Sequence, residues 1–112
     1  TALIPALTAS ALPSDRFVFE GFLPKKKGRQ TRLRDLATEP RTLVLYESPH
    51  RLLRTLDDLM EHLGADRQAA VARELTKTYE EIERGTLSEV RSYFGGYTKV
   101  RGECVIVIHG AS

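Results

Sequence analysis

Residues 41–64, RTLVLYESPHRLLRTLDDLMEHLG, hold the signals of a buried strand and of an amphipathic helix in direct succession. The first part, TLVLYES, is an almost unbroken apolar run, which is typical of a strand covered on both faces. Leucine and methionine side chains then recur at helical spacing over residues 52–63 and form one apolar stripe. Ser48 is expected as the N-cap, Pro49 at the first helical position and Gly64 as the stop. This stretch therefore predicts a strand followed directly by a helix.

The flanking sequence predicts more units of the same two kinds. Runs rich in β-branched and aromatic residues, or in alternating apolar ones, predict further strands at 16–22, 68–75, 79–85 and 103–110. Further helices are expected at 2–11, at about 31–37 and at 86–94, the last of them opened by the capping-box sequence TLSE. The strand at 79–85 is too charged for the centre of a sheet and is expected at its edge, in an antiparallel hairpin with the strand before it. The fold class is α/β: one domain over residues 1–112, with a mixed five-stranded sheet flanked by about four helices.

Positive charge is concentrated in one segment of a chain whose net charge is only +2. Residues 21–35, GFLPKKKGRQTRLRD, contain six cations and a single acid, at the last position. The two glycines are too far apart for a P-loop, and Arg29 and Gln30 replace its Lys-Ser/Thr ending. Two interpretations remain open: a solvated loop, or a surface that holds nucleic-acid phosphates by counterion release.

Polar side chains follow two of the predicted strands. YESPHR places Glu47, His50 and Arg51 after one strand, where ligands tend to bind in open α/β sheets. The alternative is that Ser48 is only a helix cap and that Glu47 pairs locally with Arg51. ARELTKTYEE gathers Arg73, Glu74 and Lys77 at a strand turn, and here the alternative is a charged hairpin without a function.

Several classes of protein are disfavoured by what the sequence lacks. The motifs HExxH, GxSxG and CxxC are absent, and the three histidines show no spacing that suggests a metal site. The single cysteine, Cys104, excludes an internal disulfide and is expected as a buried thiol. No apolar run approaches the roughly 20 residues that span a bilayer. The start at Thr1 without a methionine suggests a piece of a longer protein.

Four segments in order give a more specific indication. ALTASALPSDRFVFEGFLPKKKG, RTLVLYESPHRL, VARELTKTYEEIERGTL and GECVIVIHG together resemble the C-terminal half of the ribosomal RNA small-subunit 2′-O-ribose cytidine methyltransferases, in the tetrapyrrole methylase superfamily. The resemblance covers essentially the whole chain. It implies an S-adenosyl-L-methionine-dependent methyl transfer to a cytidine 2′-hydroxyl of small-subunit rRNA by a cytoplasmic, homodimeric, two-domain enzyme. The N-terminal domain with the glycine-rich cofactor loop is absent, so residues 1–112 are expected to be inactive alone.

The resemblance also carries positions over to the cofactor: Thr1, Ala2, Tyr46, Ala70, Gly102 and Glu103. Thr1 and Ala2 match a turn that faces the methionine part of the cofactor, and Tyr46 matches a position beside the adenosine. Ala70 matches a small residue whose backbone approaches the adenine. Gly102 and Glu103 match backbone groups that close the adenine pocket.

The resemblance places small-subunit rRNA, or the assembled small ribosomal subunit, as the partner. The cations expected at its phosphates are Lys25, Lys26, Lys27, Arg29, Arg32, Arg34 and Arg51. A ribose hydroxyl is a poor nucleophile, so a nearby base or cation would help the transfer. The candidates, among which the sequence does not choose, are Glu47, His50, Arg73, Glu74 and Lys77. The alternatives are a methylase of tetrapyrroles, which would not need so concentrated a positive charge, and a non-catalytic RNA-binding or dimerisation module.

Overall fold

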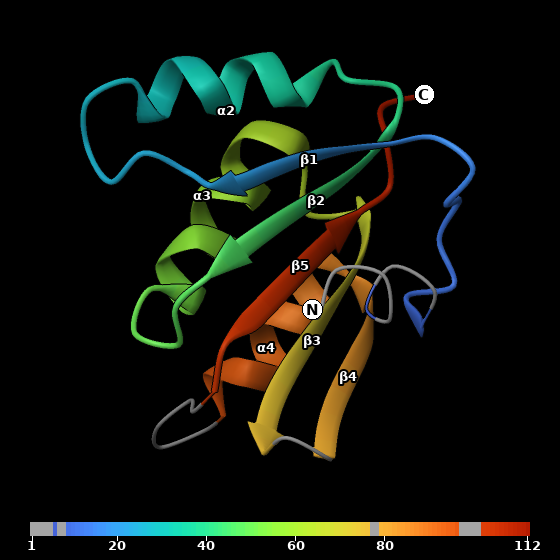
Figure 1. The fold of residues 1–112 in the computed structure, drawn as a ribbon. Helices are drawn as coiled ribbons and strands as arrows, with labels where there is room; N and C mark the ends of the chain where they lie inside the picture. The colour runs from blue at the N-terminus through green and yellow to red at the C-terminus, as the bar shows by residue number, and fades with distance from the viewer. Residues whose placement is uncertain (1–5, 7–8, 77–78, 97–101) are drawn as a thin grey trace.

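Five strands and three helices make up the described part of the chain, which is residues 6, 9–76, 79–96 and 102–112 of a computed structural model (Figure 1). In chain order they are β1 (Phe17–Phe22), α2 (Arg29–Ala37), β2 (Thr42–Glu47), α3 (Leu52–Leu63), β3 (Gln68–Thr76), β4 (Tyr79–Thr86), α4 (Leu87–Gly95) and β5 (Cys104–Ile108). The predicted helix at 2–11 lies largely outside the described residues. None of the helices in the described ranges is long and apolar enough to cross a membrane.

The sheet is mixed, with the order β1-β2-β5-β3-β4. β1 and β2 are parallel, whereas β5 runs antiparallel to both β2 and β3. β3 and β4 form the predicted antiparallel hairpin, and the charged strand β4 lies at the edge, as predicted. All five residues of β5 are buried because this strand fills the centre of the sheet.

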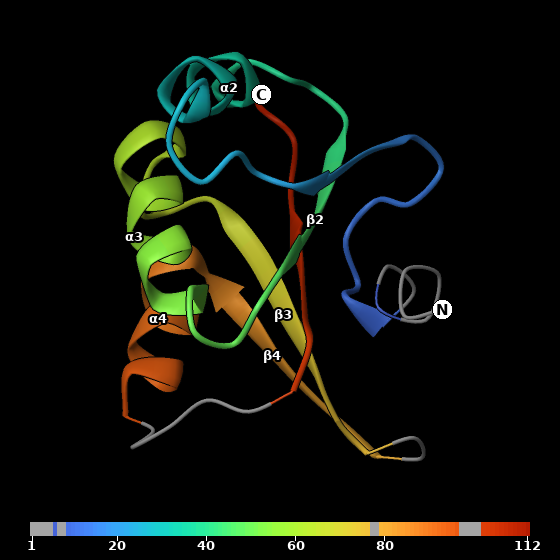
Figure 2. The same ribbon diagram turned by 60° about the vertical axis from the view of Figure 1, so that its left-hand side comes forward.

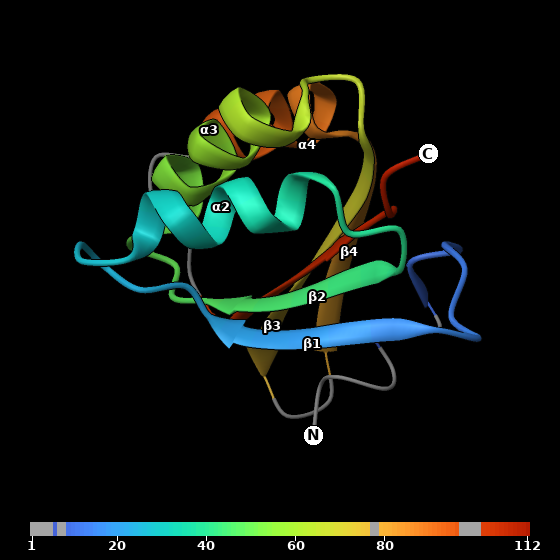
Figure 3. The ribbon, with the colours of Figure 1, turned by 90° about the horizontal axis from the view of Figure 1, so that it is seen from above.

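The three helices pack on one face of the sheet, as Figures 2 and 3 show from the side and from above. Alternate strand residues such as Leu43, Leu45 and Ile106 point into this layer and meet the apolar stripe of α3, including Leu56 and Leu59, all without exposed surface. Each such leucine side chain stabilises the fold by about 1.5–3 kcal/mol relative to an exposed one. The opposite face, on which α2, α3 and α4 do not lie, carries a smaller cluster that includes Tyr46 and also Ala6 of the N-terminal segment. We call it the Tyr46 face.

The start of α3 corrects the sequence-based expectation. The helix begins at Leu52, and Arg51 is its N-cap without a side-chain capping bond, so Ser48 is not the cap and Pro49 is not the first helical residue. The N–H of Ser48 instead donates to Oε1 of Glu47 at 2.8 Å, and Arg51 N–H donates to the Ser48 carbonyl at 3.1 Å. A separate turn therefore precedes the helix. The end of α3 is as predicted, because Gly64 stops it with a φ of 104°.

The start of α4 confirms the prediction from TLSE. Oγ1 of Thr86 accepts the Glu89 N–H at 3.1 Å, and Oε1 of Glu89 accepts the Thr86 N–H at 2.8 Å. This reciprocal pair satisfies two of the N–H groups that a helix leaves open at its start. It also fixes the direction in which α4 leaves β4.

Candidate functional site

Strand register brings most of the predicted site residues to one end of the sheet. Tyr46 pairs with Val105, and Cys104 stands between Glu47 on one side and Arg73 on the other. The carboxyl ends of β2 and β3 thus flank the amino end of β5. The β1–α2 and β2–α3 connections leave the sheet at this same end (Figure 1). We call it the β2–β3 end.

Alternation along the strands divides these residues between the two faces. Tyr46 belongs to the cluster of the Tyr46 face, with Val105 and Ala72. Ala70, two residues before Ala72, shares this face and is buried. Glu47, one residue on from Tyr46, points under the helices. Tyr46 and Ala70 therefore lie on the same face of the sheet, on the two strands that flank β5, and the candidate base Glu47 points to the other face.

Three aromatic rings gather on the Tyr46 face where β1 and β2 end. The ring centroid of Tyr46 lies 5.0 Å from that of Phe19 and 5.8 Å from that of Phe22, both edge-on, and the two phenylalanines are 47% and 58% exposed. A bulge makes this possible, because the register shifts between Phe19 and Gly21, and Gly21 has a φ of 66°. Neither phenylalanine was predicted as a site residue. The signal that was present is a glycine inside a strand, which often marks a bulge.

Gly102 and Glu103 lie at the β2–β3 end just before β5. The carbonyl of Glu103 accepts the Glu74 N–H at 3.0 Å, which extends the pairing of β3 with β5. Gly102 has a φ of 87°, and a Cβ placed on it would stand 1.8 Å from the Glu74 carbonyl oxygen. Only glycine fits at this position, because the conformation and the space both exclude a side chain.

Glu47 is one member of a buried polar network. Its side chain is 4% exposed; Oε1 accepts the Ser48 N–H, and Oε2 accepts the Thr55 hydroxyl at 2.6 Å. The Thr55 oxygen accepts Nη2 of Arg29 at 3.0 Å, and Arg29 Nε donates to Oδ2 of Asp58 at 2.9 Å. Within the described residues Glu47 forms no ion pair with Arg51, so the predicted local pair is not present. Thr55 and Asp58 carried no signal in the sequence beyond their place on α3.

Arg29 differs from the other cations of its segment. It is 3% exposed, and besides Thr55 and Asp58 it binds the Pro24 carbonyl through Nη1 at 3.0 Å. Its guanidinium therefore faces the interior, not a solvent-side partner, which corrects the expectation that it contacts RNA. The side chains of Lys25, Lys26 and Lys27 are exposed.

The remaining arginines of the segment lie along α2. Arg32 is partly exposed and pairs with Glu20 at 2.8 Å, whereas Arg34 is exposed and donates to the Thr31 hydroxyl at 3.3 Å. Arg51 is half-buried at the end of the turn before α3. These cations border the β1–α2 connection, so the structure keeps the concentration of positive charge that the sequence shows.

Arg73 on β3 belongs to a second polar group under the helices, next to Cys104 on β5. Arg73 is buried and pairs with Glu81, whose carboxylate also accepts the Tyr93 hydroxyl. Burial is the main cause that raises the pKa of the Cys104 thiol to about 12, with Arg73 acting in the opposite direction and Glu103 adding to the rise. Cys104 is thus the buried thiol that was predicted.

The other predicted site residues are placed as follows. His50, Glu74 and Glu103 are exposed, and His50 lies in the turn before α3. Thr1, Ala2 and Lys77 lie outside the described residues. No group of three or more histidine, cysteine, aspartate or glutamate side chains in the described ranges could hold a metal ion.

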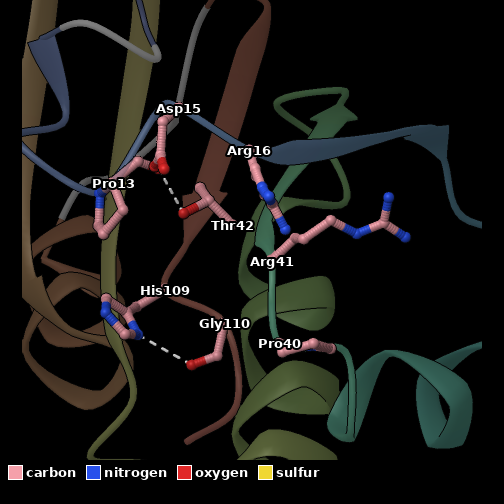
Figure 4. A pocket seen from close by; sticks show the side chains of 8 residues that line it. All are labelled: Pro13, Asp15, Arg16, Pro40, Arg41, Thr42, His109 and Gly110. Atoms are coloured by element: carbon pink, nitrogen blue, oxygen red, sulfur yellow. Dashed lines mark hydrogen bonds between the residues drawn. The ribbon is translucent and has the colours of Figure 1, made fainter.

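Two hollows lie at opposite ends of β1 and β2. One, of about 200 Å³, is at the β2–β3 end and is lined by Phe22, Leu23, Lys25, Glu47, Ser48 and Arg51. The other, of about 280 Å³, is at the start of these strands, where Arg16, Arg41 and His109 surround it (Figure 4). The guanidinium of Arg41 is bound to Glu39 there, and Nδ1 of His109 lies 2.8 Å from the Gly110 carbonyl. Only the first hollow coincides with predicted site residues.

Comparison with known proteins gives a consistent result. The family model described as Tetrapyrrole (Corrin/Porphyrin) Methylases matches residues 1–91. A protein of Synechocystis sp. named ribosomal RNA small subunit methyltransferase I is 55% identical over 113 residues, which cover 100% of this chain and 40% of that protein. The protein of the same name from Pseudomonas aeruginosa is 50% identical over 111 residues, which cover 97% of this chain and 39% of that protein. The chain therefore spans about 40% of the length of these curated relatives.

Solved structures resemble the fold more distantly. The methyltransferase CobJ superposes with a TM-score of 0.70 at 22% identity. The match covers 99% of this chain and 48% of the CobJ chain. The uroporphyrin-III C-methyltransferase of Thermus thermophilus, in complex with S-adenosylhomocysteine, gives a TM-score of 0.56 at 22% identity. The match covers 90% of this chain and 48% of that protein. At these identities the likeness shows a shared fold.

Proposed function

The chain belongs to the tetrapyrrole methylase family, and from this premise we propose that it is the C-terminal half of a two-domain methyltransferase that acts on small-subunit ribosomal RNA. The reaction is transfer of a methyl group from S-adenosyl-L-methionine to the 2′-hydroxyl of a cytidine. Relatives that align with nearly the whole chain bear the name ribosomal RNA small subunit methyltransferase I, which supports the RNA substrate over a tetrapyrrole.

One feature of the geometry carries the proposal. The exposed cations of the β1–α2 connection stand beside the end of β2, and Lys25 lines the same hollow as Glu47 and Ser48. A surface for RNA phosphates thus adjoins the strand end at which the proposed cofactor position Tyr46 lies. A compact macrocycle would not need so extended a positive surface, whereas a polyanionic strand is held by one.

The residues of the Tyr46 face fit part of the cofactor. Tyr46 is half-buried, so part of its ring is open where an adenine would pack. When bound, S-adenosyl-L-methionine supplies an electrophilic methyl group on a sulfonium sulfur. In this proposal Tyr46 and Ala70 form the wall of the adenosine site on the side of the sheet. The backbone of Gly102 and Glu103 closes the pocket at the β2–β3 end.

The acid–base groups of this chain are of two kinds, those that are buried and those that a substrate could reach from solvent. Both carboxylate oxygens of Glu47 already accept hydrogen bonds, and Arg73 is buried in its pair with Glu81. These two groups position the strand ends. His50 and Glu74 are exposed at the β2–β3 end, so they are the described candidates for receiving the proton of the ribose hydroxyl. The partner in this proposal is the small-subunit rRNA, and the working form is a cytoplasmic homodimer.

Activity is expected to need the whole protein. The full-length protein should methylate small ribosomal subunits at one cytidine ribose, mapped by mass spectrometry of nuclease digests, whereas residues 1–112 alone should be inactive. Calorimetry should detect no tight binding of S-adenosyl-L-methionine to this chain alone, because the proposed cofactor cleft lies between two domains. Tight cofactor binding by the chain alone would contradict the two-domain proposal. Methylation of a tetrapyrrole and of no rRNA would contradict the substrate.

Replacement of Lys25, Lys26 and Lys27 together by alanine should weaken RNA binding in the full-length protein and leave cofactor affinity nearly unchanged. If each lysine contacts one phosphate, the slope of log K against log salt should fall by about 2. A salt titration of RNA binding by fluorescence anisotropy measures this slope. The matched control removes three exposed cations elsewhere, Arg16, Arg41 and Arg54. An equal loss of slope in the control would mean that the effect reflects total charge and not this surface.

A further inference from the structure

The hollow of about 200 Å³ at the β2–β3 end lies between the end of β1 and the turn that precedes α3. It is several times larger than the roughly 30 Å³ that one water occupies in the liquid, and smaller than the about 300 Å³ at which ordinary ligand pockets begin. Its size therefore suits one group of a larger ligand and not a whole cofactor. Its outer wall includes the exposed ring of Phe22.

Arg51 has an unused hydrogen-bond donor beside this hollow. Its Nη2 atom is buried and has no hydrogen-bond partner. A buried guanidinium nitrogen without a partner costs free energy, because it has lost its water without gaining an acceptor. Donors of this kind are found at sites where a ligand supplies the acceptor.

The charges around the hollow favour an anion. Lys25 and Arg51 contribute two cations, and the lining holds one carboxylate, Glu47, whose oxygens accept from Ser48 and Thr55. Within the described residues no ion pair joins Glu47 to Arg51, so the lining has an excess of one positive charge. A guanidinium fork with a free donor, next to a flexible lysine, is suited to phosphate oxygens.

Phe22 adds a second kind of contact. Its side chain is 58% exposed, and it is held in place by the edge-on contact with Tyr46 and by the bulge at Gly21. A fixed, exposed ring beside a cationic hollow is the arrangement by which proteins hold single-stranded nucleic acid, with a base stacked on the ring and the phosphate held by the cation. A base within a duplex has no free face for this contact.

We propose that this hollow binds one phosphate of a single-stranded RNA segment through Arg51 and Lys25, with the adjoining base stacked on Phe22. The proposal rests on the proposed function, because it assigns the RNA to the β2–β3 end. It goes further in selecting unpaired RNA and in placing one nucleotide beside the proposed site of methyl transfer.

The test uses the full-length protein with two RNA probes, a single-stranded oligonucleotide of the target region and the same sequence in a duplex. Arg51→Gln should weaken single-strand binding by about tenfold to 100-fold, the loss expected when a charged hydrogen-bond donor is removed. Arg51→Lys keeps the charge but not the fork and should recover part of the affinity. Arg54→Gln, an exposed position one turn further along α3, is the matched control and should leave affinity unchanged.

Phe22→Leu should weaken single-strand binding by about tenfold through lost stacking and leave duplex binding unchanged. Cofactor affinity, measured by calorimetry, should be unchanged in the Arg51 and Arg54 variants. Phe22 contacts the proposed cofactor position Tyr46, so its variant is judged by the difference between single-strand and duplex binding. A circular dichroism melting curve shows whether each variant keeps its fold, and Arg51→Lys remains informative if Arg51→Gln does not.

Three outcomes would overturn the inference. If Arg51→Gln and Phe22→Leu bind RNA normally while the triple lysine variant does not, the RNA lies elsewhere on the cationic surface and the proposed function stands. If these variants lose cofactor affinity but keep RNA affinity, the anion in the hollow is the carboxylate of the cofactor. If neither these variants nor the triple lysine variant changes RNA affinity, the proposed RNA surface itself fails.

Discussion

Arg29→Ala should lower the free energy of unfolding by about 3–5 kcal/mol, the cost of breaking a buried pair by removing one partner. Arg29 is the hub of the network between α2 and α3: its guanidinium binds Asp58, the Thr55 hydroxyl and the Pro24 carbonyl. Alanine would leave Asp58 without its cation and Thr55 without a donor to its oxygen. Urea denaturation followed by circular dichroism measures the loss.

Arg34→Ala is the matched control, because Arg34 lies on the same helix and is exposed. Its substitution should change the free energy of unfolding by no more than about 0.5 kcal/mol, as is usual at the surface. If the two variants were equally stable, the buried contacts of Arg29 would contribute nothing net. Arg29→Lys should fall between them, since an ammonium cannot serve all three acceptors from one fixed plane.

The same network links the proposed RNA surface to the strand ends. Pro24 directly precedes the three exposed lysines, and its carbonyl is held by Arg29, which reaches Glu47 through Thr55. The position of the lysine loop relative to the end of β2 therefore depends on one buried side chain.

The elements of this fold were predictable where the signal is local. The unbroken apolar run of β5 predicts a covered strand, TLSE predicts a capping box, and Gly64 predicts a helix end. The insertion of β5 between β2 and β3 was not predictable, because it depends on pairing between distant segments. The start of α3 was misjudged because the turn at Ser48 is stabilised by the Glu47 carboxylate and by Arg51, contacts that a cap preference does not describe.

In the candidate site, too, the properties that depend on contacts between distant segments could not be predicted from the sequence. Lys25 and Arg29 are both cations of one run, and the run does not reveal that one is exposed and the other buried. The partner that decides this, Asp58, is 29 residues away in sequence. The exposed ring of Phe22 likewise depends on the bulge at Gly21, which shifts Phe22 back to the face of Phe19. Burial of a charge and the face of a strand residue are consequences of tertiary packing.

Gly102→Ala should lower the free energy of unfolding by about 2–5 kcal/mol, from two causes that add. A non-glycine residue in the left-handed region, here with a φ of 87°, costs about 1–2 kcal/mol. The new Cβ would also stand 1.8 Å from the Glu74 carbonyl oxygen, and relief of such overpacking typically costs about 1–3 kcal/mol more. If Gly102 closes the adenine pocket as proposed, the full-length variant should also bind S-adenosyl-L-methionine more weakly.

Gly28→Ala separates the two causes, because Gly28 has a similar φ of 83° but no atom within 4 Å of the position that a Cβ would take. Its substitution should cost only the conformational part, about 1–2 kcal/mol, and should leave cofactor affinity unchanged. Urea denaturation and calorimetry on the two variants give both comparisons. Equal destabilisation would mean that β3 and β5 move apart readily at this end. Reduced stability of Gly102→Ala with intact cofactor affinity would place the adenine away from Gly102, because a shift of this backbone could not then reach it.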